Sequence, residues 1–266
     1  MNYTDCTHMP NGMLARGCLP RDTRLGAEQP IFEDTYAIYP RSDWPDLIRQ
    51  NQSLRSLVLK IKDQKQEGSC ASNATTQVLQ VCWLQTFGFR AFVEFSPISI
   101  YRWVANSPND GSTIDGNLRQ LKEVGALPVR NTDSQGKLAI MGLPVGHVLE
   151  PTGYYQDFPS DWKSTAAFFQ GIESLDIGSF DGMVSASLDG FAIVYGRAGH
   201  AICGVSPYQD GSKYGIDYAN SWGNWGDEGF GKDTESFISR AISSYGAWAL
   251  RSVKVTDEAL NLAIPV

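Results

Sequence analysis

Residues 64–70 read Gln-Lys-Gln-Glu-Gly-Ser-Cys and lead into a mostly apolar run that ends near Phe87. Gly-Ser predicts a flexible entry into a helix that begins at Cys70, and Gly88 follows as a cap. Unpaired N–H groups and the helix dipole favour negative charge at such an N-terminus, so they favour a thiolate at Cys70. Cys70 is therefore a candidate nucleophile, although a lone cysteine in this setting is more often structural.

Two later segments supply the groups that a thiol nucleophile needs. Residues 199–201 read Gly-His-Ala, and residues 220–226 read Asn-Ser-Trp-Gly-Asn-Trp-Gly. An imidazole at His200 takes the thiol proton and returns it to the leaving group. The amide oxygen of Asn220 accepts the second ring N–H and fixes the tautomer, and Trp222 covers that hydrogen bond. Taken alone, a histidine or a Gly/Trp-rich turn is more often structural.

Gln64 completes the candidate site. Its side-chain amide, together with the backbone N–H of Cys70, can stabilise the oxygen of a tetrahedral intermediate as an oxyanion hole. Gln66 is the nearby competitor, and both glutamines are also compatible with an exposed loop. His200 lies 130 residues after Cys70 in the chain, and Asn220 follows it. Order, spacing and local chemistry together favour an enzyme over four unrelated structural residues.

The chain divides into an N-terminal arm, residues 1–43, and a folded body, residues 44–266. The arm is rich in Pro, Gly, Arg and Asp without a sustained period, which predicts either an extended arm over the body or a partly ordered tail. The body is predicted to be mainly helical over about 44–150 and rich in strands over about 151–256, with a short C-terminal tail. The fold class is therefore α+β.

The pattern of apolar residues predicts individual elements. Helices are expected over about 70–87, 98–104, 113–124, 160–175 and 233–244, and strands over about 191–195, 200–205, 214–219 and 247–253. Cys70 then falls in the helical half, and His200 and Asn220 in the β-rich half. Reactive groups divided in this way meet in a cleft between two lobes.

Composition excludes several classes of protein. The chain has 266 residues, a formal charge of −7 and a pI near 5.0, which argues against nucleic acid bound through phosphate contacts. No apolar run approaches the length of a membrane span, and the first residues lack a secretory signal. A cytoplasmic or virion-associated setting is expected rather than secretion. The chemistry of the candidate site requires no cofactor and no metal.

Five cysteines are an odd number, and their spacing indicates neither a metal site nor a disulfide framework. Cys6 and Cys18 either pair with each other in an oxidising compartment or remain free. Cys82 and Cys203 lie among apolar residues and are expected to be small core residues.

The segments around residues 64–70, 199–201 and 220–230 resemble the papain family of cysteine peptidases, especially its compact, disulfide-poor prokaryotic or viral members. The similarity spans about residues 40–256. It implies a helical left lobe and a β-barrel-like right lobe that enclose an extended peptide. It also implies roles for single residues: Cys70 as nucleophile, His200 as acid and base, Asn220 as orienting group and Gln64 as oxyanion donor. By the same resemblance, the turn with Gly111 and Ser112 binds the substrate backbone.

The chain departs from this family's pattern at several positions. Glu67 stands where the family usually has a cysteine, so its common left-lobe disulfide is expected to be missing. Ala71 replaces the aromatic residue that usually follows the nucleophile, and Lys65 replaces the glycine that usually follows the glutamine. Residues 1–43 are too short for the usual helical prosegment, and we hypothesise that this arm packs on the body and partly covers the cleft.

These observations favour a thiol peptidase acting on a peptide or protein substrate. Two alternatives stay open. One is another acyl transfer at the same site, such as deamidation, amide hydrolysis or transamidation. The other is a papain-like structural or binding component of a larger assembly, for example a virion, in which residues 1–43 dock to a partner protein.

Overall fold

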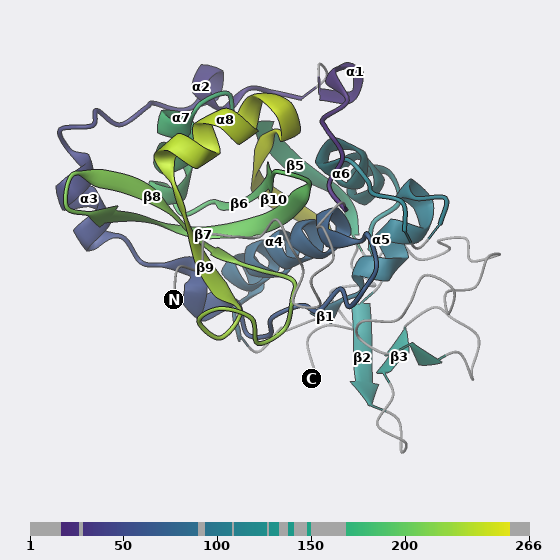
Figure 1. Ribbon diagram of the computed structural model, residues 1–266. Coiled ribbons are helices and arrows are strands. Elements are labelled where there is room, and N and C mark those ends of the chain that lie inside the picture. The colour runs from purple at the N-terminus through teal and green to yellow at the C-terminus, as the bar shows by residue number, and fades with distance from the viewer. Residues whose placement is uncertain are drawn as a thin grey trace.

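The computed structural model describes residues 17–26, 29–89, 94–107, 109–126, 128–132, 138–140, 148–149 and 169–255. Cys6, which was considered above, lies outside these residues. The described chain forms an α+β fold with a helical lobe and a β-rich lobe (Figure 1).

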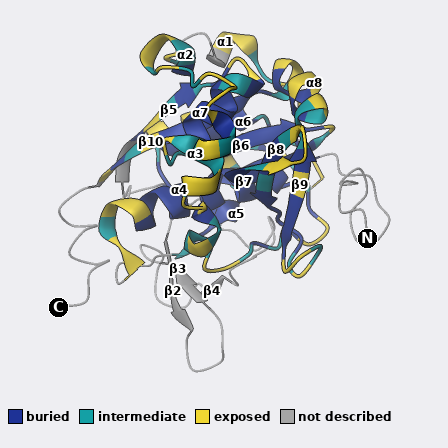
Figure 2. Cartoon of the chain, turned by 90° about the vertical axis from the view of Figure 1, so that its left-hand side faces the viewer, coloured by how far each residue is buried: buried dark blue, intermediate teal, exposed yellow. Residues whose placement is uncertain are grey.

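Helix α4, Cys70–Phe87, is the centre of the molecule, and its first and last residues are those that the sequence predicts. Gly88 ends it with a φ of 78° and donates its N–H to the carbonyl of Leu84. The helix is buried on nearly all sides because the sheet covers one side of it and other helices cover another (Figure 2). Burial all round explains why this helix has no polar face.

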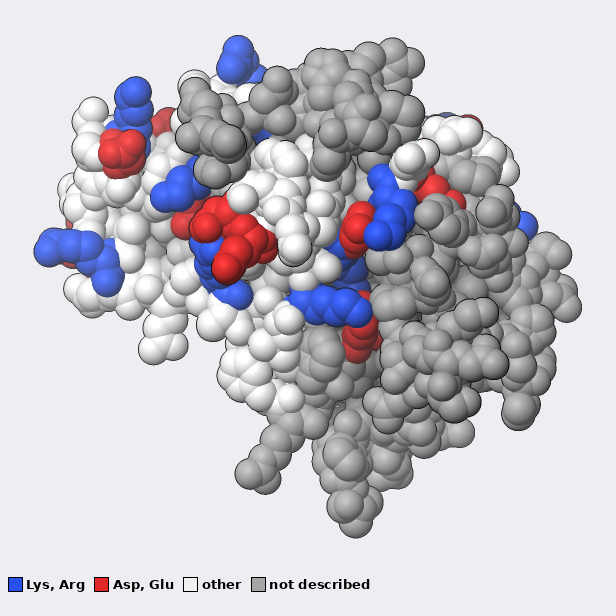
Figure 3. Space-filling model, turned by 60° about the horizontal axis from the view of Figure 1, so that its bottom comes forward, with Lys and Arg blue, Asp and Glu red and all other residues white. Residues whose placement is uncertain are grey.

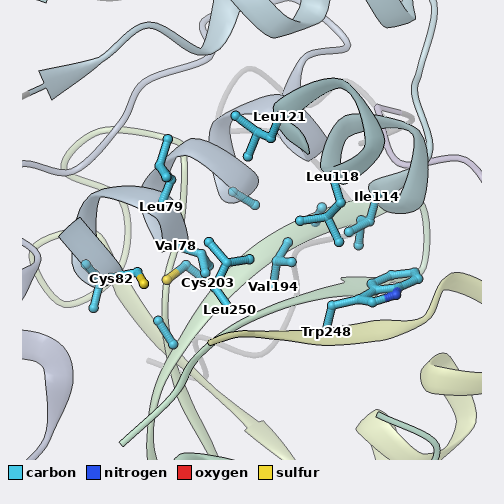
Figure 4. Close-up of a cluster of buried hydrophobic side chains, with 14 of the residues drawn as sticks. Val78, Leu79, Cys82, Ile114, Leu118, Leu121, Val194, Cys203, Trp248 and Leu250 are labelled. Atoms are coloured by element: carbon cyan, nitrogen blue, oxygen red, sulfur yellow. The ribbon is translucent and has the colours of Figure 1, made fainter. Parts of the chain in front are cut away.

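The side chains that pack around α4 come from both lobes. Val78, Leu79 and Cys82 of the helix lie in one cluster with apolar residues of α6 and of the sheet (Figure 4). The cluster members outside α4 that the figure labels are Ile114, Leu118, Leu121, Val194, Cys203, Trp248 and Leu250. One continuous core therefore joins the two lobes behind the candidate site.

Two more helices of this lobe follow the sequence pattern closely. Helix α5 spans Pro97–Val104, with Ser96 at its N-cap and proline at its first position. Helix α6 spans Ile114–Glu123, and the Thr113 side chain caps it by accepting the N–H of Gly116. Both helices are confirmed within a residue or two of the expected bounds.

The same half of the chain also contains a small sheet that the sequence did not predict. Its four strands pair in the order β1-β2-β3-β4 and span Glu94–Phe95, Pro128–Thr132, Leu138–Ile140 and Val148–Leu149. The strands have two to five residues each, too short to show an alternating pattern.

The β-rich lobe is a six-stranded antiparallel sheet in the order β5-β10-β6-β7-β8-β9. In chain order the strands span Phe169–Asp176, Ala192–Arg197, His200–Asp210, Lys213–Ala219, Phe230–Thr234 and Ala247–Val255. Helices α7, Phe180–Leu188, and α8, Glu235–Tyr245, cover the side of the sheet opposite α4. Four of the strands and α8 were predicted, whereas α7 was not.

One predicted helix is wrong where the structure describes it. The expected helix over about 160–175 overlaps β5, which begins at Phe169. Phe169, Ile172 and Leu175 are three residues apart, a spacing typical of a helix face. In the structure this segment pairs with β10 through a register that shifts twice, and such irregularity breaks strict alternation.

The N-terminal residues pack on the body and contain short helices. These are α1, Thr23–Gly26, α2, Phe32–Thr35, α3, Trp44–Gln50, and the 3₁₀ turn Leu54–Leu57. Phe32 and Trp44 are fully buried in the core cluster beneath α7 and α8. The described residues before Trp44 therefore lie against the rest of the chain, with Phe32 in its core.

The surface carries both signs of charge. On the face shown in Figure 3, acidic and basic side chains are interspersed among neutral residues. In the described part of the chain, no helix combines the length and the apolar character that a membrane span needs.

Candidate active site

Cys70 lies at the first position of α4 and is fully buried. The backbone N–H groups of Ala201, Ala71 and Cys70 itself each lower the pKa of this thiol. Two of these belong to the helix N-terminus, which is the anion-favouring setting that the sequence predicted. The third belongs to the residue after His200, so the fold brings the sulfur and the start of β7 together across the lobes.

His200 is held by the side chain of Asn220. The His200 Nε2 and Asn220 Oδ1 atoms are 2.7 Å apart, and the same Oδ1 accepts the N–H of Ser221 at 2.7 Å. An amide oxygen only accepts, so Nε2 carries the hydrogen and Nδ1 is the basic atom of the ring. Within the described residues, Nδ1 has no hydrogen-bond partner. Asn220 therefore holds the ring, but in the described chain Nδ1 makes no hydrogen bond to the Cys70 sulfur.

Trp222 covers the imidazole. Its ring stacks on His200 with the ring centroids 4.6 Å apart and an angle of 27° between the planes. Trp225 in turn meets Trp222 edge to face at 5.5 Å. The Gly/Trp-rich turn therefore shields the His200–Asn220 pair from water, as expected for Trp222.

The two candidate glutamines, Gln64 and Gln66, differ in burial. Gln64 is buried, whereas Gln66 is exposed. The Gln64 Oε1 accepts the hydroxyl of Ser221 at 2.7 Å, and its Nε2 donates to the carbonyl of Glu67 at 2.8 Å. The side chain is thus fixed between the nucleophile loop and the Asn220 turn, and one of its two N–H groups is engaged by Glu67.

Lys65 adopts a φ of 54°, in the left-handed region that favours glycine. Its backbone N–H donates to Asp63 Oδ1 at 3.0 Å, and its ammonium pairs with Asp63 Oδ2 at 2.6 Å. The departure from glycine at this position is therefore accommodated by bonds to Asp63.

An extended stretch of the arm occupies the cleft between the lobes. The N–H of Ser112 donates to Gly17 O at 3.0 Å, and Leu19 N donates to Ser112 O at 3.0 Å. From the other lobe, the carbonyl of Gly199 accepts the N–H of Cys18 at 2.8 Å. Ser112 makes both bonds on the helical side, and Gly111 lies next to it. The candidate substrate-binding turn thus does bind a peptide segment, one that belongs to the same chain.

Gly17 lies directly against the nucleophile. A Cβ added at Gly17 would lie 2.7 Å from Cys70 Sγ and 2.6 Å from the carbonyl oxygen of Gly68. Atoms do not approach so closely, so only glycine fits here. The Gly17 carbonyl accepts the N–H of Ser112, and the segment forms a parallel bridge to Ser112 at Cys18. The segment therefore lies against the Cys70 sulfur.

Burial keeps both reactive groups neutral. Burial raises the pKa of Cys70 to about 12, although backbone N–H groups partly offset this effect. Burial lowers the pKa of His200 to about 4, against the effect of its bond to Asn220. At neutral pH the covered site is therefore a thiol beside a neutral imidazole, and a thiolate–imidazolium pair requires that the site open to solvent.

Three contributors were not found in the sequence: the Gly17–Leu19 segment, the Gly199 carbonyl and the Ser221 hydroxyl. All three act through backbone groups or through a neighbouring side chain, which residue type alone does not indicate. The proximity of Gly199 and Ser221 to His200 and Asn220 was the available signal. Nothing in the arm's composition singled out Gly17.

The described cysteines are all free thiols and all buried: Cys18, Cys70, Cys82 and Cys203. Cys82 and Cys203 are core residues, as predicted. Across the residues that the structure describes, no group of three or more His, Cys, Asp or Glu side chains is arranged to hold a metal ion.

Comparison with known proteins adds information on the fold. No protein-family model matches the sequence, and no curated protein matches it. Among solved structures, xylellain, a cysteine protease from Xylella fastidiosa, is similar with a TM-score of 0.60 and 18% identity, over 90% of this chain and 97% of that one. Digestive procathepsin L 3 of Tenebrio molitor gives 0.58 and 14%, over 89% and 76% of the two chains.

A third similar structure holds the cysteine protease and lectin-like domains of Cwp84, a surface layer associated protein of Clostridium difficile. It gives a TM-score of 0.57 and 15% identity, over 76% of this chain and 51% of that one. At such low identity these likenesses concern the fold alone. The chain has the papain-like two-lobe fold.

Proposed function

We propose that this chain is a cysteine peptidase with Cys70 as nucleophile and His200 as acid–base group. The observation that carries the proposal is the 2.7 Å bond from His200 Nε2 to Asn220 Oδ1. It is made at the start of the strand whose Ala201 N–H reaches the Cys70 sulfur. Proteins of the same fold that are named cysteine proteases support the choice.

The reaction follows from these positions. The Cys70 thiol loses its proton to His200 Nδ1, and the sulfur attacks the carbonyl carbon of the substrate. The imidazolium then gives the proton to the leaving amine as the C–N bond breaks, which leaves a thioester on Cys70. Water, deprotonated by His200, attacks the thioester, releases a carboxylate and restores the thiol.

The oxyanion formed in both steps needs donors. The Cys70 N–H is one, and the second N–H of the Gln64 amide is the other. The Ser221 hydroxyl fixes Gln64 by its oxygen, so its nitrogen stays on the side of the nucleophile loop. Removal of one such donor costs about 10²–10³ in kcat.

The substrate is an extended polypeptide. The cleft already binds an extended segment through main-chain groups of Ser112 and Gly199. Such bonds recognise backbone rather than a particular side chain, and this is how proteins bind a peptide as an added strand. A peptide substrate has to replace Gly17–Leu19 at these groups, so the arm regulates access to the site.

The test uses the full chain and a peptidyl epoxide that alkylates active thiols. We expect Cys70 to be modified and peptide cleavage to be lost in Cys70→Ala, while Cys82→Ala, on the same helix, keeps both. Mass spectrometry of the products distinguishes peptide-bond hydrolysis from deamidation or transamidation. A Cys70→Ala protein that still cleaves peptides would refute the proposal.

A further inference from the structure

Cys18 of the arm is inserted into a pocket next to the nucleophile. Its side chain is 2% exposed, whereas that of its neighbour Leu19 is 43% exposed. The bonds of Gly17 and Leu19 to Ser112, and of Cys18 to Gly199, fix the backbone from both lobes. Fixed in this way, the segment directs one side chain, that of Cys18, into the β-rich lobe.

The pocket exists because residue 196 of β6 is a glycine. A Cβ at Gly196 would lie 3.2 Å from the Cys18 sulfur and 2.3 Å from Cβ of Tyr245. Tyr245 is the last residue of α8. Because it lies against Gly196, it forms the wall of the pocket next to the Cys18 sulfur. A bond of 3.1 Å from Gly196 N to Gly246 O holds this wall against the strand. Because α8 packs against β6, moving Tyr245 away from the Cys18 sulfur would cost packing energy.

The far side of this pocket is also filled. A Cβ at Gly246 would meet the Trp248 ring at 2.1 Å, so this ring lies directly behind the wall. Trp248 is fully buried against Ile114 and Val194 in the core (Figure 4). A longer side chain in place of Cys18 therefore has no space to extend into without moving Tyr245.

A buried carboxylate gives the pocket a charge preference. Asp115 at the start of α6 accepts the N–H of Asp22 at 2.9 Å and is fully buried. Burial raises the pKa of the Cys18 thiol, and the nearby carboxylate of Asp115 raises it further. A negative side chain in the pocket would meet the same repulsion.

We infer that the pocket formed by Gly196 and Tyr245, with the carboxylate of Asp115 nearby, selects a small, uncharged side chain in the peptide that this site cleaves. The inference rests on the peptidase function proposed above. The selected residue is the neighbour of the one whose carbonyl meets Cys70, because Cys18 is the neighbour of Gly17. Successive side chains of an extended peptide point to opposite sides in either chain direction. A substrate bound by Ser112 and Gly199 therefore also places one side chain in the pocket at Gly196.

The first test uses the arm itself as the probe and needs no catalysis. In the full chain, Cys18→Leu overfills the pocket and displaces the arm, whereas Cys18→Ala leaves it seated. We expect iodoacetamide to alkylate Cys70 about tenfold faster or more in Cys18→Leu, since overpacking costs about 1–3 kcal/mol. Leu19→Ala, at an exposed position, is the matched control and should keep the wild-type rate.

Tyr245 provides the complementary change. Tyr245→Ala combined with Cys18→Leu should bring the alkylation rate back towards the wild-type value, because the smaller wall makes room for leucine. Tyr245→Phe, which removes only the hydroxyl, should not. An unchanged rate in Cys18→Leu, or a rate in the double variant that stays at that of Cys18→Leu, would overturn the inference.

The second test reads the substrate directly in the full-length Gly17→Leu chain, whose arm cannot seat against Cys70. In a peptide set varied at this one position, kcat/KM should favour Ala and Ser over Leu and Phe by about tenfold or more, with Asp disfavoured. If the Gly17→Leu chain cleaves the peptides without this preference, the inference about the pocket is wrong and the peptidase function stands. If the Gly17→Leu, Cys70→Ala chain binds the peptides with this preference but the Gly17→Leu chain does not cleave them, the pocket stands and the peptidase function is wrong.

Discussion

Two parts of the N-terminal arm are held to the body in different ways. The cleft segment, residues 17–22, is attached mainly by backbone hydrogen bonds and by the ion pair of Arg21 with Asp176. The anchor segment, residues 29–44, buries Phe32 and Trp44 completely within the core. Hydrogen bonds can be exchanged for bonds to a substrate or to water at little net cost, whereas buried rings cannot.

The difference indicates which part moves. The cleft segment can leave as a unit of low local stability while the anchor segment stays folded. Glu33 adds to this contrast, because its carboxylate accepts the N–H of Gly178 and the hydroxyl of Ser179 at the start of α7. The anchor segment thus completes the β-rich lobe, and the cleft segment closes the site.

The largest effect is expected at the anchor. Phe32→Ala removes a fully buried ring that stacks on Tyr36 and should lower the free energy of unfolding by about 3–5 kcal/mol. Urea denaturation measures this loss. Leu19→Ala, in the cleft segment, should change it by less than about 0.5 kcal/mol. Similar losses for both variants would erase the distinction between the two segments.

The next effect is expected at Gly17. Gly17→Leu places a side chain where the Cys70 sulfur and the Gly68 carbonyl already lie, so the cleft segment should be expelled. Peptidase activity and alkylation of Cys70 should rise by about 10–100-fold, while the urea midpoint changes little. Equal activity in the wild type and in Gly17→Leu would show that the cleft segment does not restrict access.

Acidification should release the cleft segment. The pKa of His200 is lowered to about 4 in the covered site, and an uncovered imidazole titrates nearer 6.5. The released state therefore binds the proton more readily, and the stability of the covered state is lost as pH falls from 6.5 towards 4. The shift corresponds to up to about 3 kcal/mol.

Hydrogen exchange at the Cys18 and Leu19 amides, corrected for intrinsic rates, measures this release. Burial raises the pKa of Asp115, which acts in the opposite direction, so the control is His200→Gln. The part of the pH dependence that the imidazole causes should vanish in that variant. Exchange that depends on pH equally in both proteins would mean that another group controls the segment.

The smallest effect is expected at the turn whose Gly199 carbonyl binds the cleft segment. Ala198 and Gly199 form the two-residue turn between β6 and β7, with φ values of 44° and 88°. Two positive φ angles define a turn that prefers Asn-Gly. Ala198→Asn should raise the free energy of unfolding by about 0.5–1 kcal/mol and leave the arm seated. A loss of stability would show that this turn is not strained by alanine.

The sequence predicted the parts of the fold that depend on side-chain pattern. Cys70 begins α4 as expected because Gly-Ser and an apolar run define that helix, and Thr113 caps α6. The prediction from sequence failed at β5, where Ile172 and Leu175 have a helix-like spacing, and at the short strands β1–β4. In those places pairing with distant strands decides the structure, and local pattern does not record it.

The candidate site shows the same division. Cys70, His200, Asn220 and Gln64 could be proposed from the sequence because their side chains have distinctive chemistry in a distinctive order. Gly17 was not identified, because its contribution is the absence of a side chain at a point 2.7 Å from the sulfur. Contacts that depend on shape between remote segments become visible only when the chain is folded.

The high pKa of the buried Cys70 sulfur also bears on how long the molecule lasts. Peroxides oxidise thiolates far faster than thiols, and oxidation beyond the sulfenic acid is essentially irreversible. A covered chain therefore resists inactivation by oxidants while it waits. In the proposed peptidase, opening of the site would make the Cys70 sulfur reactive towards peptides and would expose it to oxidation at the same time.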